Sequence, residues 1–419
     1  MKRILCLLLS LLLMLPSLSV SAAEQKSGRF YASFLQNWMC RDWTAERWEE
    51  EFLHARQAGF QALILQSVCD IVRGEPTGTA PQDPAAYGNS SCFCMYPSAI
   101  PALQQAYRSS QNSGDALALA LKAAEKTGML LWIGTVNDDL WWKYGWGIPA
   151  SGGSSGTYFG DWCAENAALT AALISEITER YSGYRAQIGG FYYTNELWNI
   201  DAACLRTDDG QYAKLIGGNL RSVISALPPE TPLLISPFYN PDICTPAQFS
   251  AFLQALADEA GFRPFDIYAP QDGGGAEREP AVLRAWAEAQ KAAVGARMRF
   301  WMNYETFNEG LTAKPVTALQ ENYAATADLA EGAVVFSWNH YYAADAALDD
   351  AFTAFSLSSV PGDVNGDGML SAADVILLQQ YLHGLRHLQV PDASDLNGDG
   401  VCDIFDLALL KHELLSCKA

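Results

Sequence analysis

Residues 188–196 read IGGFYYTNE, and residues 299–305 read RFWMNYE. Each is a short aromatic and apolar run that ends in Glu, and a long alanine- and leucine-rich stretch follows it. This pairing of a strand-like run with a helix-like stretch occurs eight times between residue 28 and about residue 357. Eight successive βα units predict an α/β domain that closes into a parallel (β/α)8 TIM barrel, rather than an open sheet. The predicted strands are residues 29–36, 60–68, 129–136, 188–196, 233–239, 265–270, 299–305 and 333–339.

The connections differ in length on the two ends of this predicted barrel. Links from helix to strand are brief, whereas the loop after the second strand runs from Cys69 to about Ser113. The loop after the third strand carries Trp141, Trp142 and Trp146. Because active sites of such barrels are built from the loops at the carboxyl ends of the strands, we expect the chemistry at that end.

Two glutamates end predicted strands at this face. Alternation along a strand places Thr194 and Glu196 on one face of the fourth strand, and Asn303 and Glu305 on one face of the seventh. If both faces point inward, two carboxylates meet across the barrel mouth. Hydrolysis of a glycosidic bond needs one carboxylic acid to protonate the leaving oxygen and one carboxylate to attack carbon or activate water. Other carboxylates near strand ends are the alternative candidates, namely Asp70, Asp138, Asp139 and Asp272.

Asn195-Glu196 ending strand four, Glu305 ending strand seven and Trp338 ending strand eight together resemble the clan A TIM-barrel glycosidases. The resemblance implies that Glu196 is the acid/base, that Glu305 is the nucleophile and that configuration is retained. The barrel is also similar to the family called domain of unknown function 4434, through FYASFLQ at 30–36, GFY at 190–192, QDG at 271–273 and NYETF at 303–307. Predicted substrate contacts are Asn195, Asn303, Asp272, Trp141, Trp142, Trp146, Trp338 and His340. Strict alternation turns the Asn195 side chain away from Glu196, so its role would need a local twist.

The end of the chain repeats one hexapeptide, Asp-x-Asn-Gly-Asp-Gly, at residues 363–368 and 395–400. Oxygen ligands at every second position and a glycine at position 6 are typical of a calcium loop. The first predicted ligand set is Asp363, Asn365, Asp367, the Met369 carbonyl, Ser371 and Asp374. The second is Asp395, Asn397, Asp399, the Val401 carbonyl, Asp403 and Asp406. We therefore predict two calcium ions.

Each loop is followed by one apolar helix and preceded by none, so the repeat resembles a type I dockerin over about residues 361–417. The resemblance implies a small all-α module of two loop-helix repeats that folds with calcium and binds a cohesin on a cellulosome scaffold. Positions 10 and 11 of each loop would contact the cohesin. These are Ala372 and Ala373 in the first loop but Ile404 and Phe405 in the second, which predicts one preferred orientation.

Composition sets the remaining limits. Residues 1–23 have the charged start, leucine-rich core and small-residue end of a secretory signal peptide, which predicts export without a membrane span. The expected domains are then the barrel at 28–357 and the dockerin at 358–419. A net charge of −20 argues against nucleic acid as a partner. Nine cysteines remain after cleavage, and buried thiols are favoured over metal ligands for them.

These expectations combine into a secreted, cellulosome-associated glycoside hydrolase that acts on polysaccharide or oligosaccharide and needs no catalytic cofactor. Two alternatives stay open: a barrel that binds glycans without cleaving them, and a lyase or esterase that uses His340 or an aspartate.

Overall fold

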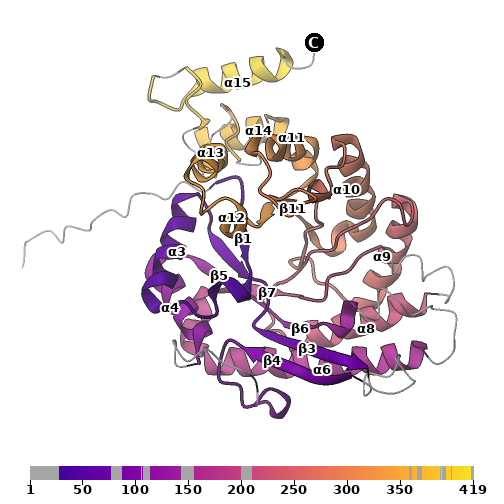
Figure 1. Ribbon diagram of the computed structural model, residues 1–419. Helices are drawn as coiled ribbons and strands as arrows, with labels where there is room; N and C mark the ends of the chain where they lie inside the picture. The colour runs from indigo at the N-terminus through magenta and orange to yellow at the C-terminus, as the bar shows by residue number, and fades with distance from the viewer. Residues whose placement is uncertain are drawn as a thin grey trace, which may run out of the picture.

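The computed structural model describes residues 28–76, 87–104, 106, 114–142, 155–199, 210–357, 361–365, 370–386, 388, 393–397 and 399–416. Its centre is a parallel barrel, shown in Figure 1. The barrel strands are β1 (Ala32–Leu35), β2 (Ala62–Leu65), β5 (Leu130–Gly134), β7 (Ile188–Tyr192), β8 (Leu233–Ile235), β9 (Ile267–Tyr268), β10 (Arg299–Phe300), β11 (Met302–Glu305) and β12 (Ala333–Phe336). Each of the eight predicted strands contains at least one of these, so the predicted fold class is confirmed.

The ring closes through a single residue. The strand order is β10-β9-β8-β7-β5-β2-β1-β12-β11, and only Trp301 separates β10 from β11. The Trp301 N–H donates to the Tyr268 carbonyl on one side (2.9 Å), while the Met302 N–H donates to the Gly332 carbonyl on the other (3.1 Å). The predicted seventh strand therefore pairs with both neighbours and joins the two ends of the sheet.

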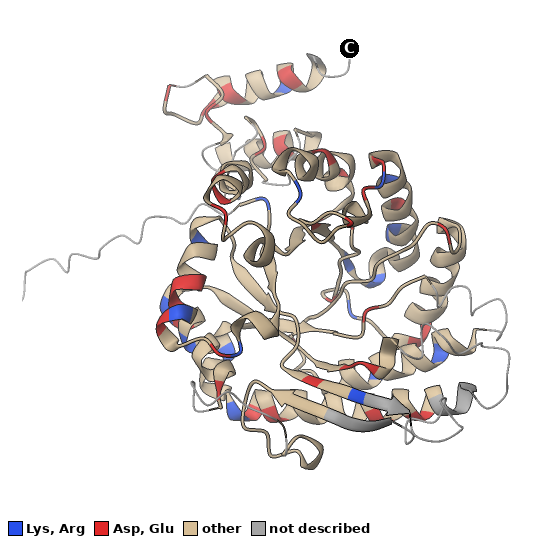
Figure 2. Cartoon of the chain, viewed as in Figure 1, with Lys and Arg blue, Asp and Glu red and all other residues tan. Residues whose placement is uncertain are grey.

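Helices surround the barrel. They are α3 (Ala45–Gln57), α4 (Ala116–Thr127), α6 (Ser155–Arg180), α8 (Gln211–Ala226), α9 (Pro246–Ala260), α10 (Pro280–Val294), α11 (Val316–Thr326) and α13 (Ala346–Leu357), with the short α2 (Asn37–Cys40) and α12 (Trp338–Tyr341) at strand ends. Several of them start at a side-chain cap, as where Thr245 and Gln248 form a capping box at α9. Others end at a left-handed glycine, such as Gly128 after α4. Figure 2 shows the charged residues mainly on these helices and on the tail, while the barrel strands are mostly tan.

The connection after β2 contains secondary structure that the sequence did not predict. β3 (Cys69–Pro76) and β4 (Tyr87–Cys94) pair as an antiparallel hairpin. β6 (Val136–Asp138), of which only Val136 was predicted to belong to the third barrel strand, pairs with β3 instead. This second sheet lies at the carboxyl ends of β2 and β5, the end where we expected the site.

Burial divides the barrel domain into an inner and an outer apolar core. A small inner cluster joins side chains from all round the ring and includes Phe34, Ile64, Trp132, Tyr192 and Trp301. A larger cluster fills the space between strands and helices. Membership of Tyr192 and Trp301 in the inner cluster shows which face of β7 and of the seventh strand points inward.

The tail has its own core. Its helices are α14 (Ala372–Leu382) and α15 (Ile404–Ser416). Leu378 and Leu410, which occupy equivalent places in the two sequence repeats, are both fully buried and pack with Val364, Leu388 and Leu407. The predicted loop-helix repeat is therefore present. Within the described part of the chain, no helix is both long and apolar enough to cross a membrane.

Candidate active site

Glu196 and Glu305 lie at the carboxyl end of the barrel, on the inward side. Glu305 is the last residue of β11, two positions after Asn303 and four after the inward Trp301. Glu196 follows the inward Tyr192 by four residues. Glu305 is 7% exposed, whereas Glu196 is partly exposed. The negative charge of Glu196 contributes to the raised pKa of Glu305, so the two carboxyl groups are close enough to interact.

One short segment after β9 contacts both carboxylates. The Gln271 side chain donates a hydrogen bond through Nε2 to Glu196 Oε1. Four residues later, the backbone N–H of Gly275 donates to Glu305 Oε2. Between them, Asp272 Oδ1 accepts from the backbone N–H of Glu305 at 3.2 Å. The segment 271–275 thus fixes both candidate catalytic groups from one loop.

Glycine is required where this segment approaches Glu305. A Cβ at Gly275 would lie 2.8 Å from Glu305 Oε2 and 2.9 Å from Phe307 Cζ. A Cβ at Gly274 would lie 2.8 Å from Asp272 Oδ2. Real Cβ atoms do not approach oxygen or carbon this closely, so the missing side chains let the backbone reach the carboxylate.

Two buried polar side chains, Lys314 and Asn322, hold the Glu305 backbone and Asp272. Lys314, which is 2% exposed, donates through Nζ to the Glu305 carbonyl at 3.0 Å. Asn322 donates through Nδ2 to Asp272 Oδ2 at 3.0 Å. These hydrogen bonds join the buried Lys314, Asn322 and Asp272 into a polar base beneath Glu305.

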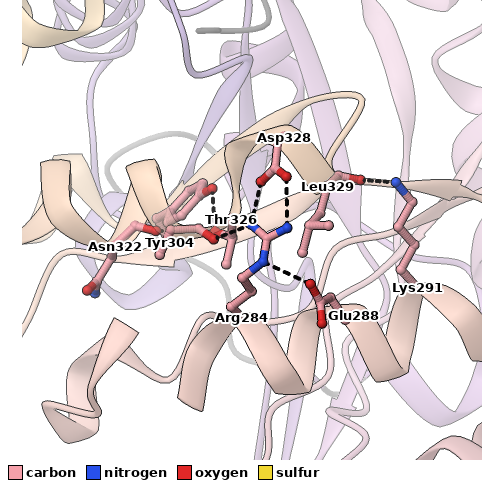
Figure 3. A network of polar contacts seen from close by, with 9 residues as sticks. Arg284, Glu288, Lys291, Tyr304, Asn322, Thr326, Asp328 and Leu329 are labelled. Carbon is pink, nitrogen blue, oxygen red and sulfur yellow. Dashed lines mark hydrogen bonds and ion pairs between the residues drawn. The ribbon is translucent and has the colours of Figure 1, made fainter. Parts of the chain in front are cut away.

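This base continues outward to the helices, as Figure 3 shows. The Thr326 hydroxyl bonds to the Tyr304 hydroxyl (2.9 Å) and donates to the Asn322 carbonyl (3.2 Å). On the outer side, Arg284 of α10 pairs with Asp328 through two bonds of 2.8 and 2.9 Å. The end of α11, which carries Asn322, is therefore held to both β11 and α10.

The electrostatic setting raises the pKa of both glutamates. Burial raises the pKa of Glu196 to about 7, and the hydrogen bond from Gln271 opposes that rise. Burial and the charge of Asp272 raise the pKa of Glu305 to about 8, against the Gly275 N–H and Lys314. Burial also raises the pKa of Asp272, and Lys314 opposes it. The pair therefore retains a proton near neutral pH, as general acid catalysis requires.

The two predicted asparagine contacts have different positions. Asn303 is 1% exposed and donates to Ser236 Oγ at 2.9 Å, while its Oδ1 has no hydrogen-bond partner among the described residues. Asn195 is 2% exposed, and its Nδ2 donates to Asn166 Oδ1 of α6 at 2.9 Å. The strict alternation thus holds, and Asn195 packs toward α6 rather than beside Glu196.

Trp338 was expected to form a sugar platform, and this expectation is wrong. β12 ends at Phe336 and α12 begins at Trp338, so strand alternation no longer sets its direction. The Trp338 side chain is fully buried, packs against His54 and Phe60, and donates to Asp349 at 2.7 Å. It belongs to the outer core and cannot contact a substrate.

Trp141 also packs in the core, but it acts on the site indirectly. It is 5% exposed, packs at a tilt against Phe159 and Trp162, and donates through Nε1 to the Glu196 carbonyl at 2.9 Å. Trp142 is half-buried and packs near Phe238. Trp146 lies outside the described residues.

Two aromatic side chains that were not predicted as substrate contacts, Phe307 and Tyr341, lie near Glu305. Phe307 stacks on Tyr341 with ring centroids 5.3 Å apart, and it also contacts the inward Phe336. Burial, and then the charge of Glu305, raise the pKa of Tyr341. His340 stacks on Tyr341 and lies 5.3 Å from Trp38, which is 54% exposed. Burial lowers the pKa of His340, so it is neutral near pH 7.

The remaining alternative candidates for the catalytic carboxylates, Asp70, Asp138 and Asp139, have structural partners. Asp138 pairs with Arg73 and accepts from the Trp162 indole at 3.2 Å. Asp139 accepts from the Arg73 backbone N–H at 3.0 Å. Asp70 accepts hydrogen bonds from Asn37, from the Ser67 hydroxyl at 2.6 Å and from Asn137 at 3.2 Å. These contacts tie the β3 and β6 ends together.

The two tail loops share one internal pattern. Asp374 and Asp406, the residues at position 12, are both fully buried. Asp374 accepts backbone N–H bonds from Asn365 (3.2 Å) and Ser371 (2.8 Å), and Asp406 accepts the equivalent bonds from Asn397 (3.3 Å) and Asp403 (2.8 Å). Asp367 and Met369 lie outside the described residues. In the part of the chain that is described, no three His, Cys, Asp or Glu side chains converge as a metal site.

Residues at the starts of the tail helices differ between the repeats. Ile404 is 62% exposed and Phe405 is 67% exposed, and Val401 beside them is also exposed. Ala372 and Ala373 are exposed too, but they offer little apolar area. The asymmetry predicted from the sequence is therefore present on the surface.

Two families of known sequences match different parts of this chain. Residues 27–347 match the family described as Domain of unknown function (DUF4434), and the chain belongs to this family. Residues 361–415 match the Dockerin type I domain. The comparison with curated proteins gave no match.

Solved structures with a similar chain path are glycoside hydrolases of low identity. The endo-1,4-beta-D-mannanase from Thermotoga petrophila has 15% identity and a TM-score of 0.46, over 74% of this chain and 88% of that one. The endo-1,4-beta-mannanase from Rhizomucor miehei has 12% identity and a TM-score of 0.44, over 78% and 94%. The intracellular xylanase from Thermoanaerobacterium saccharolyticum has 10% identity and a TM-score of 0.43, over 75% and 91%.

Proposed function

We propose that this protein is an exported glycoside hydrolase that cleaves polysaccharide or oligosaccharide and attaches to a scaffold through its dockerin. The observation that carries the catalytic half is the pairing of Glu305, at the end of β11, with Glu196, four residues beyond β7, both held by the segment 271–275. Both carboxyl groups have a raised pKa, so one proton is available near neutral pH. A glycosidase needs such a pair.

The roles of the two groups follow the resemblance to clan A glycosidases. Glu305 accepts a backbone N–H and lies near Lys314, and both contacts favour its charged form, but burial and the charge of Asp272 outweigh them and leave its pKa, about 8, above the value of about 7 for Glu196. The proposed reaction therefore requires the shared proton to be on Glu196 when the substrate is bound. Glu196 has a neutral amide donor and is partly exposed, which suits an acid that exchanges its proton with water. In the proposed reaction, Glu305 attacks the anomeric carbon while Glu196 gives its proton to the departing oxygen. Glu196 then removes a proton from the water that releases the sugar, and Glu305 is freed with configuration retained.

The proposed attachment to a scaffold rests on the tail. Type I dockerins bind calcium, and the buried carboxylates of Asp374 and Asp406 at position 12 fit that role in each loop. Calcium would replace the mutual repulsion of the loop carboxylates with oxygen coordination, and so would favour the folded tail. The exposed Ile404 and Phe405 form the apolar surface that a cohesin would cover, which gives one preferred orientation. Residues 1–23 would direct export.

Two variants test the catalytic assignment together. Glu305→Gln should lower kcat by about 10³-fold or more on all substrates. Glu196→Gln should spare kcat/KM on aryl glycosides whose leaving group needs no proton, but it should lower kcat because the second step still needs Glu196 as a base. For the nucleophile, azide added to Glu305→Gly should restore turnover and yield a glycosyl azide. Exposed Glu309→Gln is the matched control and should keep full activity.

Other outcomes would point to the alternatives. Binding of glycans without release of sugar from a broad polysaccharide and aryl glycoside panel would identify a non-catalytic binding barrel. Products that lack the mass of an added water would identify a lyase, and release of an acyl group would identify an esterase. Inversion at the anomeric carbon, followed by proton NMR, would keep the hydrolase but remove the nucleophile role of Glu305.

A further inference from the structure

Three cysteine side chains meet in the β3–β4 hairpin. Cys69 is the first residue of β3, and Cys92 and Cys94 lie at the end of β4. Cys94 pairs directly with Cys69, and Cys92 comes two residues before Cys94, so strand alternation places all three side chains on one face. The Cys69 thiol is hydrogen-bonded to the sulfurs of both Cys92 and Cys94. No step of the proposed hydrolysis uses these groups.

The place of Cys69 and Cys94 in the strand ladder allows their sulfurs to join. The Met95 N–H donates to the Val68 carbonyl at 2.9 Å, so these two residues take a hydrogen-bonded position of the ladder. The next pair, Cys69 and Cys94, is therefore of the non-hydrogen-bonded kind, in which opposite Cα atoms are about 4.5 Å apart. Disulfides span Cα separations of about 4.4–6.8 Å. A bond can thus close without separating the strands, and its short span favours easy reduction.

Cys92 differs from the other two cysteines in position and in exposure. It lies opposite Ile71, so it is diagonal to Cys69, where Cα atoms are about 7–8 Å apart and a disulfide is strained. Cys69 and Cys94 are 0% and 1% exposed, whereas Cys92 is only partly buried. A small molecule in solvent therefore reaches Cys92 first.

The surroundings of Cys92 also favour its reactive thiolate form. The hydrogen bond from Cys69 lowers the pKa of Cys92, and burial opposes this effect. Of the nearby charges, Asp70 raises the pKa of Cys92 and Arg73 lowers it. The hydrogen bond to Cys92 raises the pKa of Cys69 well above its ordinary value, so Cys69 keeps its proton. Because the thiolate is the nucleophile in disulfide exchange, Cys92 is the thiol that reacts with an incoming disulfide.

We propose that Cys69, Cys92 and Cys94 form a redox-active group that is oxidised by a low-molecular-weight disulfide and stores this oxidation as a Cys69–Cys94 disulfide. The Cys92 thiolate attacks one sulfur of the small disulfide, forms a mixed disulfide and releases the first small thiolate. Cys69 then loses its proton and attacks the Cys92 sulfur, which releases the second small thiolate. Cys94 loses its proton and attacks the Cys69 sulfur, and Cys92 leaves as a thiolate. The strain of the diagonal bond favours this last exchange.

The exchange is balanced in atoms and electrons. Two protein thiols become one disulfide, one small disulfide is reduced to two small thiols, and these take up the protons from Cys69 and Cys94. The proposal rests on the hairpin alone, so it stands whether or not Glu196 and Glu305 are catalytic.

The test is peptide mapping of the full chain after incubation with oxidised glutathione and alkylation with N-ethylmaleimide. Trypsin places Cys69 in peptide 57–73, and Cys92 and Cys94 together in peptide 74–108. Oxidation should join these two peptides, and dithiothreitol should separate them. Fragmentation of the joined product between Cys92 and Cys94 identifies the bonded cysteine in the wild type, and we expect Cys94. The result therefore does not depend on the folding of any variant.

Three variants test the separate roles of the thiols. Cys92→Ala should still give the joined peptides but slow their formation by about tenfold or more, since only buried thiols remain to react. Cys94→Ala should prevent the joined product from accumulating and leave glutathione on Cys92. Cys402 of the tail is partly buried, as Cys92 is, so Cys402→Ala is the matched control and should change neither the product nor its rate.

Four outcomes would overturn the proposal. They are the absence of a joined product in the wild type, a final product bonded through Cys92, an unchanged rate in Cys92→Ala, and an equal slowing in Cys402→Ala. Among the described residues, the three sulfurs are not arranged as a metal site. Binding of a zinc ion by the reduced chain that is lost in Cys92→Ala would contradict this arrangement and would also overturn the proposal.

Discussion

Glu305 should destabilise the folded barrel as the pH rises, and Glu305→Gln should remove that effect. The pKa of Glu305 is about 8 in the folded protein against an ordinary value of 4.5. Between these two pH values the folded protein keeps a proton that the unfolded chain has released, so the free energy of unfolding falls by about 1.4 kcal/mol for each pH unit. Over this interval the loss is on the order of 5 kcal/mol. It is absent below pH 4.5 and complete above pH 8.

The assay is thermal unfolding of the wild type and the variant at pH 5 and pH 8. The three pH units from pH 5 to pH 8 account for about 4 kcal/mol of this loss. A barrel of about 330 residues has an unfolding entropy of about 0.7 kcal/mol/K, so 4 kcal/mol corresponds to about 6 °C. The Tm of the wild type should fall by about this much more than that of Glu305→Gln. Exposed Glu309→Gln should follow the wild type, since its side chain is in water in both states. Parallel Tm curves for wild type and Glu305→Gln would refute the burial argument.

Three further outcomes follow from the described contacts. Gly275→Ala should lower kcat by about 10²-fold, since its Cβ would lie 2.8 Å from Glu305 Oε2, and unchanged kinetics would contradict the close approach. Trp141→Phe removes the hydrogen bond to the Glu196 carbonyl and should lower kcat by about tenfold with little change in KM; a rise in KM alone would instead indicate a substrate contact. Chelation of calcium should reduce the helical circular dichroism of the full chain and abolish cohesin binding, and Asp406→Ala should do so in the presence of calcium; equal spectra with and without chelator would argue against coupled folding.

Sequence periodicity predicted the barrel because each strand carries its own signal. All eight strands are present, and the parity that turns Trp301 inward also orients Glu305. Glu196 lies four residues beyond the end of β7 and is held by Gln271 and Trp141. The sequence predicted the tail equally well, because Leu378 and Leu410 repeat with the loops that precede them. In both cases the information lies within a few residues of the element.

The parts that were missed depend on contacts between distant segments. Nothing near Glu196 in the chain indicates that Gln271 would bind it, because the contact spans 75 residues. The run of three glycines at 273–275 was a signal of close backbone approach, and it points to Glu305 only once the barrel is closed. Trp338 was misplaced because β12 ends at Phe336, three residues before the predicted end at residue 339, and a helix begins at Trp338.

The way segment 271–275 holds both carboxylates divides the barrel mouth into a part that can be redesigned and a part that cannot. Any insertion in this segment would move the two reacting groups relative to each other, and activity would be lost on every substrate at once. The hydrogen bonds described for Glu196 and Glu305 come from segment 271–275, Trp141 and Lys314, and none of these residues belongs to the β3–β4 hairpin. Its length and composition can therefore change while the reaction geometry stays fixed, so libraries that aim at a new sugar preference belong there.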